Sequence, residues 1–161
     1  MILHVLRTMH DLLCFENMET FEKNPIIKTT NEISFLYQMI TFFGCKRKTL
    51  IHSIILYRTY KTLEKRNISK HIESGVLVVL IQIASKMNEN KGLVASSKAI
   101  RTFIPYNITV DSLMQLELYV LSVLNWDVAY TQTLNQIEES LVGIKEEQII
   151  ESINKEIDAI L

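Results

Sequence analysis

Glycine and proline are scarce in this chain, with 4 and 2 residues among 161. Hairpins and tight turns depend on these two residue types, so their scarcity favours long helices over many short strands. Hydrophobic residues make up 48% and charged residues 22%, which is ordinary for a folded protein and argues against disorder. The length then predicts one compact all-α domain, or one domain with a short appendage.

Cysteine is also rare, with Cys14 and Cys45 as the two in the chain. The first 15 residues are apolar, but charged residues and histidines interrupt them, and they lack the features of a signal peptide. Without a secretory context, we expect reduced thiols in an intracellular protein rather than a disulfide. The apolar run Val76–Ile81 is far shorter than the roughly 20 residues that span a bilayer, so no membrane partner is expected.

Signatures of catalysis and of nucleic-acid binding are missing as well. The net charge of -1 gives no basic field, so no nucleic-acid partner is expected. The glycines stand too far apart for a phosphate loop, and the histidines do not cluster with cysteines or carboxylates at metal-ligand spacing. His52 lies among apolar residues and is predicted to be a hydrogen-bonded structural histidine. The sequence therefore predicts no catalytic residue, no metal and no cofactor.

Apolar residues recur at helical spacing along most of the chain. Helices are predicted at residues 2–17, 29–43, 49–65, 69–88, 93–103 and 109–125, and two amphipathic stretches follow within 131–161. The sequence predicts a capping box at Thr29 and Glu32, a helix terminator at Gly44 and an N-cap at Thr109. The helix at 69–88 is apolar on nearly every side, which predicts a central position, and Gly75 within it predicts close backbone packing. The last stretch carries an apolar stripe: Ile149, Ile150, Ile153 and Ile157.

Two apolar stretches hold a single charged residue each. Lys86 is the only charge between residues 75 and 86, and Glu117 is the only charge between residues 113 and 126. Ions are seldom left unpaired in apolar surroundings, because desolvating them is costly. The two ions either pair inside the chain or serve as anchors for a partner, and the residues alone favour neither alternative. Four apolar neighbours of Glu117 are predicted to lie in the core: Leu113, Leu116, Val120 and Leu124.

These stretches resemble the paired motifs of the cyclin box. Residues 82–87 (QIASKM) are similar to the family's LLASKxEE motif. Residues 116–127 (LELYVLSVLNWD) are similar to its partner motif, a glutamate followed by a leucine-rich stretch that ends in an aromatic residue. The resemblance covers residues 29–130, and residues 106–117 are closest to the G1, D-type members. It implies an all-α protein with an N-terminal helical segment (1–24), a five-helix cyclin box (25–130) and a short helical C-terminal tail (131–161).

The resemblance also implies a function, which is to bind and activate a cyclin-dependent protein kinase in G1/S control, in the nucleus and cytoplasm. The family's lysine and glutamate, here Lys86 and Glu117, hold the loop that precedes the regulatory helix of the kinase. The apolar residues around them receive that helix: Ile83, Met87, Leu121 and Trp126. A cyclin contributes no catalytic group, so the chain is expected to regulate an enzyme rather than to be one.

The chain departs from the family pattern in three places. Residues 28–36 lack the arginine of the family's Met-Arg-x-x-Leu motif, which puts substrate recruitment through that groove in question. The family motif has two acidic residues after its lysine, and this chain has one, Glu89. The tail after Tyr130 is too short for the second five-helix repeat, so a single-box cyclin, a minimised one or a fragment is expected.

The alternative is a cyclin-fold adaptor of the transcription machinery that binds DNA or a peptide without a kinase. Such an adaptor needs a basic face for DNA, and two concentrations of basic residues are candidates, at Lys46–Lys48 and at residues 61–66. For both basic segments we prefer the simpler interpretation, that their cations lie on a solvated surface.

Overall fold

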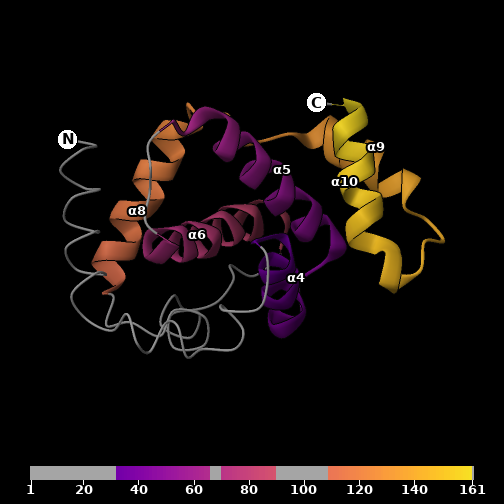
Figure 1. The fold of residues 1–161 in the computed structure, drawn as a ribbon, viewed down its shortest axis with the longest axis horizontal. Helices are drawn as coiled ribbons and strands as arrows, with labels where there is room; N and C mark the ends of the chain where they lie inside the picture. Colours follow the sequence, from indigo (N-terminus) through magenta and orange to yellow (C-terminus); the bar gives the residue numbers. More distant parts are fainter. Residues whose placement is uncertain (1–31, 66–69, 90–108, 161) are drawn as a thin grey trace.

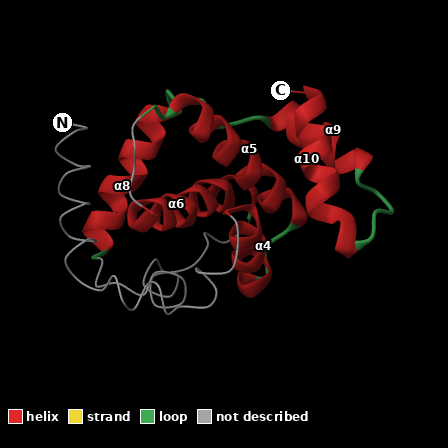
Figure 2. Cartoon of the chain, in the orientation of Figure 1, coloured by secondary structure: helices red, strands yellow, loops and turns green. Residues whose placement is uncertain are grey.

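The computed structural model describes residues 32–65, 70–89 and 109–160, and every regular element in these ranges is helical (Figure 2). The predicted all-α class is therefore confirmed. The helices are α4 (Glu32–Phe43), α5 (Arg47–Leu63), α6 (Lys70–Asn88), α8 (Val110–Val123), α9 (Thr131–Ser140) and α10 (Ile149–Ile160), with a 3-10 turn η1 (Glu146–Gln148). The helices predicted at 2–17 and 93–103, together with Cys14 and Thr29, lie outside the described residues.

Helix α6 runs through the middle of the helical array, with α8 toward one end of the molecule and α9 and α10 toward the other (Figure 1). It packs against α4, α5 and α8. Every side chain from Val76 to Ser85 is buried, which confirms the predicted central position. Gly75 allows α8 to come close, since a Cβ there would lie 2.7 Å from Leu116 Cδ2. The close packing predicted from this glycine is therefore present.

The predicted signals at two helix ends are confirmed. Gly44 ends α4 with a φ of +65°, a conformation that suits glycine. At the start of α8, Thr109 Oγ1 accepts a hydrogen bond from Ser112 N at 3.0 Å. The last helical residue of α8 is Val123, two residues before the predicted end.

Helix α5 begins two residues earlier than predicted, at Arg47 instead of Thr49, and ends at Leu63 instead of Lys65. The early start is explained by Glu89, which follows α6. Its Oε1 accepts hydrogen bonds from Lys46 N and from Thr49 Oγ1, both at 2.7 Å. A carboxylate at a helix N-terminus satisfies free amides and interacts favourably with the helix dipole. A residue 40 positions away in sequence therefore caps α5.

The C-terminal residues fold back as a helical hairpin against α5 and α4. Its apolar stripes are fully buried: Leu134, Ile137, Leu141, Ile149, Ile153 and Ile157. Ile150, predicted on the same stripe, is half-buried. Arg58 of α5 pairs with Asp158 and donates to Asn154 O, so polar contacts hold the hairpin as well. The tail thus belongs to the same hydrophobic core as the helices before it.

Within the described ranges no helix is long and apolar enough to cross a membrane. The same residues contain no group of three histidine, cysteine or carboxylate side chains placed to hold a metal ion.

Candidate partner-docking surface

Lys86 and Glu117 form an ion pair between α6 and α8. Lys86 Nζ donates to Glu117 Oε1 at 2.6 Å, and the exposed fractions of the two side chains are 59% and 18%. The internal pairing considered from the sequence is therefore present. It does not use up the hydrogen-bonding capacity of either group, because an ammonium has three donors and a carboxylate has about four acceptor sites. An ion pair this exposed contributes at most about 1 kcal/mol to stability.

The other four residues predicted at this site differ in their exposure. Met87 and Trp126 are exposed, at 47% and 62% of their surface, and Leu121 is half-buried. Ile83 is only 4% exposed and belongs to the hydrophobic core. In this structure it therefore presents little surface to a partner, because it lies on the face of α6 that packs inward.

Helix α8 has a core face and an exposed apolar face. The core face holds the four residues predicted there, each 2% exposed or less: Leu113, Leu116, Val120 and Leu124. Met114 and Leu118 are 58% and 56% exposed, although both are apolar. Neither was predicted as a site residue. The number of apolar residues in α8 is the signal that could have found them. A single buried face of a helix needs apolar residues over an arc of only about 100°, and those of α8 cover more than this.

The position of Trp126 comes from the way in which α8 ends. Asn125 and Trp126 have φ values of 55° and 59°, and Trp126 N donates to Leu121 O at 2.9 Å while Asn125 N donates to Ser122 O at 3.1 Å. This hydrogen-bond pattern is a Schellman motif, in which asparagine is a common substitute for glycine. A left-handed conformation is costly for tryptophan, by roughly 1–2 kcal/mol. Strained backbone that holds a large apolar side chain in solvent is typical of a functional position.

His52 connects the two chain segments that carry the exposed apolar residues. It is completely buried on α5, and its Nε2 donates to Val128 O at 2.6 Å. Its Nδ1 accepts from Asn88 Nδ2 at 2.7 Å, a tautomer assigned from these two partners. Burial lowers the pKa of His52, against the raising effect of its hydrogen bond to Val128 O. The prediction of a hydrogen-bonded structural histidine is confirmed. One partner, Asn88, directly follows Met87, and the other, Val128, lies two residues after Trp126.

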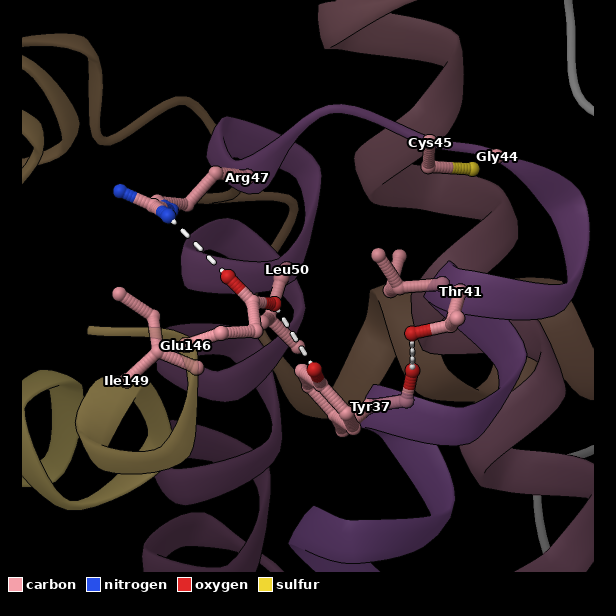
Figure 3. Close-up of a pocket in the computed structure, with 9 residues that line it drawn as sticks. Tyr37, Thr41, Gly44, Cys45, Arg47, Leu50, Glu146 and Ile149 are labelled. Carbon is pink, nitrogen blue, oxygen red and sulfur yellow. Dashed lines mark hydrogen bonds and ion pairs between the residues drawn. The ribbon is translucent and has the colours of Figure 1, made fainter.

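A separate cavity of about 370 Å³ lies between α4, the start of α5 and the residues before α10 (Figure 3). Glu146 bridges its two sides, since it accepts from Tyr37 Oη at 2.8 Å and pairs with Arg47 Nη2 at 3.3 Å. The hydrogen bond to Glu146 is the main reason that the pKa of Tyr37 is raised. Burial raises the pKa of Cys45 to about 11, which favours the neutral thiol over the thiolate. These contacts join the hairpin to α4 and α5.

In the comparison with protein families, the model described as "Cyclin, N-terminal domain" matches residues 2–129. No curated protein and no solved structure matches the chain.

Proposed function

The chain belongs to the cyclin family, because the family model covers most of its length, and from that premise we propose that it binds and activates a cyclin-dependent protein kinase. A cyclin domain is a regulatory fold, which places the chain among cyclin-like regulators. From the resemblance of residues 106–117 to D-type members, we further propose a role in G1/S control. A location in the nucleus and cytoplasm is part of the same proposal. The division into segments 1–24, 25–130 and 131–161 stays a prediction.

The observation that carries the proposal is the Lys86–Glu117 ion pair, which lies on the surface beside exposed apolar side chains. A charge pair that only stabilised the fold would not need an exposed methionine, Met87, directly after its lysine. A backbone loop of a partner offers both carbonyl oxygens for Lys86 and amides for Glu117. Charge-assisted hydrogen bonds in a desolvated interface contribute roughly 1.5–3 kcal/mol each, enough to make both residues hot spots.

The mechanism follows from how a kinase positions ATP. Activity requires that a glutamate of the regulatory helix pair with a lysine on a neighbouring strand. A regulator can favour the inward position of this helix in two ways. Its surface binds the loop before the helix, and its apolar side chains pack against the helix itself. Lys86 and Glu117 would hold the loop, and Met87, Leu121 and Trp126 would receive the helix. Ile83 would support them from the core.

Reconstitution with purified cyclin-dependent kinases from the same organism tests the proposal. The wild-type chain should raise the rate of histone phosphorylation, and the double change Lys86→Ala with Glu117→Ala should abolish the increase. The matched control is the Lys61–Glu73 pair, with a 3.0 Å separation and exposed fractions of 51% and 21%. Its double alanine variant should activate like the wild type. The proposal fails if the wild-type chain activates no kinase.

The structure does not favour the DNA-binding adaptor. Three cations from its candidate basic segments make contacts within the chain: Lys48 with Asn135, Arg47 with Glu146 and Lys61 with Glu73. Titration with duplex DNA at moderate salt separates the two functions, because an adaptor would bind DNA with a steep salt dependence.

A further inference from the structure

The cavity between α4, the start of α5 and the residues before α10 combines an apolar wall with a polar edge (Figure 3). Its apolar wall includes Ile40, Leu50 and Ile149. Two donors, Tyr37 and Arg47, lie at its edge, and both bind the carboxylate of Glu146. The volume of about 370 Å³ is within the range of ligand sites, which is roughly 300–1,000 Å³. The cavity can therefore hold a carboxylate together with an apolar side chain.

The two donors bind the carboxylate as a recognition site would. Tyr37 Oη donates to Glu146 Oε1 at 2.8 Å, and Arg47 Nη2 donates to Oε2 at 3.3 Å, so each oxygen has a donor of its own. The second bond is longer than the roughly 2.7–2.9 Å that is usual between charged groups. An arginine has five N–H donors, so one such bond does not exhaust it. The site is therefore built for a carboxylate, and it binds the one from its own chain loosely.

Glu146 can leave this site without disturbing the core. It lies on the three-residue turn η1, in which no residue is buried, and 65% of its side chain is exposed. An ion pair this exposed contributes little to stability. The buried Ile149 follows as the first residue of α10, so the core contacts of the hairpin begin after the turn. Release of Glu146 therefore frees Tyr37 and Arg47 beside an apolar wall.

The charges around the cavity indicate what would take the place of Glu146. An arginine and a tyrosine hydroxyl beside an apolar wall are complementary to a carboxylate with an apolar neighbour. The chain itself presents this combination, since Glu146 and Ile149 line the same cavity three residues apart. A doubly charged phosphate would meet more repulsion from the exposed Glu147 than a carboxylate would. The favoured occupant is therefore a peptide segment like the chain's own.

We infer that this cavity binds an acidic peptide segment of a partner protein, in which a carboxylate side chain lies next to an apolar one, and that Glu146 competes with it from within the chain. The partner's carboxylate would replace Glu146 on Tyr37 and Arg47, and its apolar side chain would pack against Ile40 and Leu50. These residues lie outside the surface proposed for the kinase. The site therefore serves a second partner and does not depend on the proposed function.

Titration of the ¹⁵N-labelled chain with the peptide acetyl-Glu-Leu-amide, followed by nuclear magnetic resonance, tests the inference. The amide signals of Tyr37, Thr41 and Arg47 should shift and saturate. The matched peptide acetyl-Gln-Leu-amide has no charge and should bind about tenfold more weakly, because its hydrogen bonds are not charge-assisted. The peptide acetyl-Glu-Gly-amide should also bind more weakly, because it buries no apolar side chain.

Three variants separate the donors from the competitor. Glu146→Ala should lower the Kd of acetyl-Glu-Leu-amide by about fivefold, because displacing an exposed ion pair weakens binding by no more than this. Arg47→Gln should abolish most of the binding. The matched control is Arg58→Gln, since Arg58 also joins α5 to the hairpin, through Asp158, and it should leave Kd unchanged. Glutamine is a good helix former, so both arginine variants should keep the wild-type circular dichroism spectrum.

Four results would overturn the inference. The first is the absence of saturable shifts in both the wild type and Glu146→Ala. The second is an Arg47→Gln variant that binds acetyl-Glu-Leu-amide as tightly as the wild type. The third is an equal Kd for the wild type and Glu146→Ala, which would rule out Glu146 as a competitor. The fourth is equal affinity for the charged and uncharged peptides, which would rule out an acidic partner. None of these results bears on kinase activation, because that proposal uses other residues.

Discussion

Replacing His52 by leucine should destabilise the fold and loosen the docking surface. The side chain is completely buried, and it bonds Val128 O at 2.6 Å and Asn88 Nδ2 at 2.7 Å. Leucine leaves the Val128 carbonyl without its partner, which costs about 1–3 kcal/mol, and a further bond of about 1 kcal/mol is lost. Asn88 keeps its bond to Ala84 O at 2.7 Å, which limits the damage. We expect urea unfolding to show a loss of about 2–4 kcal/mol.

The same histidine should make stability depend on pH. Burial is the main reason that its pKa lies below the ordinary value of 6.5, and Lys48 contributes in the same direction. Above 6.5, the folded and unfolded states both hold a neutral His52. Below 6.5, the unfolded state binds the proton more readily, so the free energy of unfolding falls as the pH falls toward the lower folded pKa. Urea midpoints should therefore decrease from pH 7 to pH 5.

A second variant separates the two effects of His52. His52→Gln can still donate to Val128 O, so it should retain part of the stability lost in His52→Leu, but it has no titrating group. Both variants should show a smaller decrease between pH 7 and pH 5 than the wild type. The reasoning is refuted if His52→Leu unfolds at the wild-type urea concentration, or if the pH dependence is the same in all three proteins.

Three further changes test the packing of the helices, each by urea unfolding. Gly75→Ala places a Cβ 2.7 Å from Leu116 Cδ2, so overpacking should outweigh the gain in helix propensity and cost about 1 kcal/mol; a stabilised variant would contradict this. Glu89→Ala removes the cap of α5 and should cost about 1–2 kcal/mol, whereas Glu138→Ala, at an exposed position in the last turn of α9, should not destabilise the fold. Ile153→Ala should cost about 2–5 kcal/mol if the hairpin shares the core, and an unchanged midpoint would show that the hairpin unfolds independently.

Most of the described helices could be predicted from the sequence because their signals are local. Apolar spacing identified α4, α5, α6 and α8, and Gly44 and Thr109 marked two ends correctly. Gly75 indicated close packing, because a helix interior tolerates glycine poorly unless something must approach it. The anchors Lys86 and Glu117 were found because each was the only charge in an apolar stretch. Whether Lys86 and Glu117 pair with each other could not be decided from the sequence, because this depends on how α6 crosses α8.

The features that could not be predicted are those that join distant parts of the chain. Glu89 caps a helix that begins more than 40 residues earlier, and no periodicity reports such a contact. The partners of His52 come from the end of α6 and from the segment after α8. Leu118 was assigned neither to the core nor to the site, because apolar spacing does not say which side of a helix the neighbouring helices leave open. Its exposure follows from the packing of α8 by a single face.

The most direct test of kinase docking is a double-mutant cycle on Kd, with Lys86→Ala, Glu117→Ala and both together. If the two residues hold one loop as a unit, either single change should cost about 2 kcal/mol, roughly thirtyfold in Kd, and the double change little more. The Lys61→Ala, Glu73→Ala double variant should bind like the wild type. Kd values within twofold of the wild type for all three variants of the cycle would contradict the account.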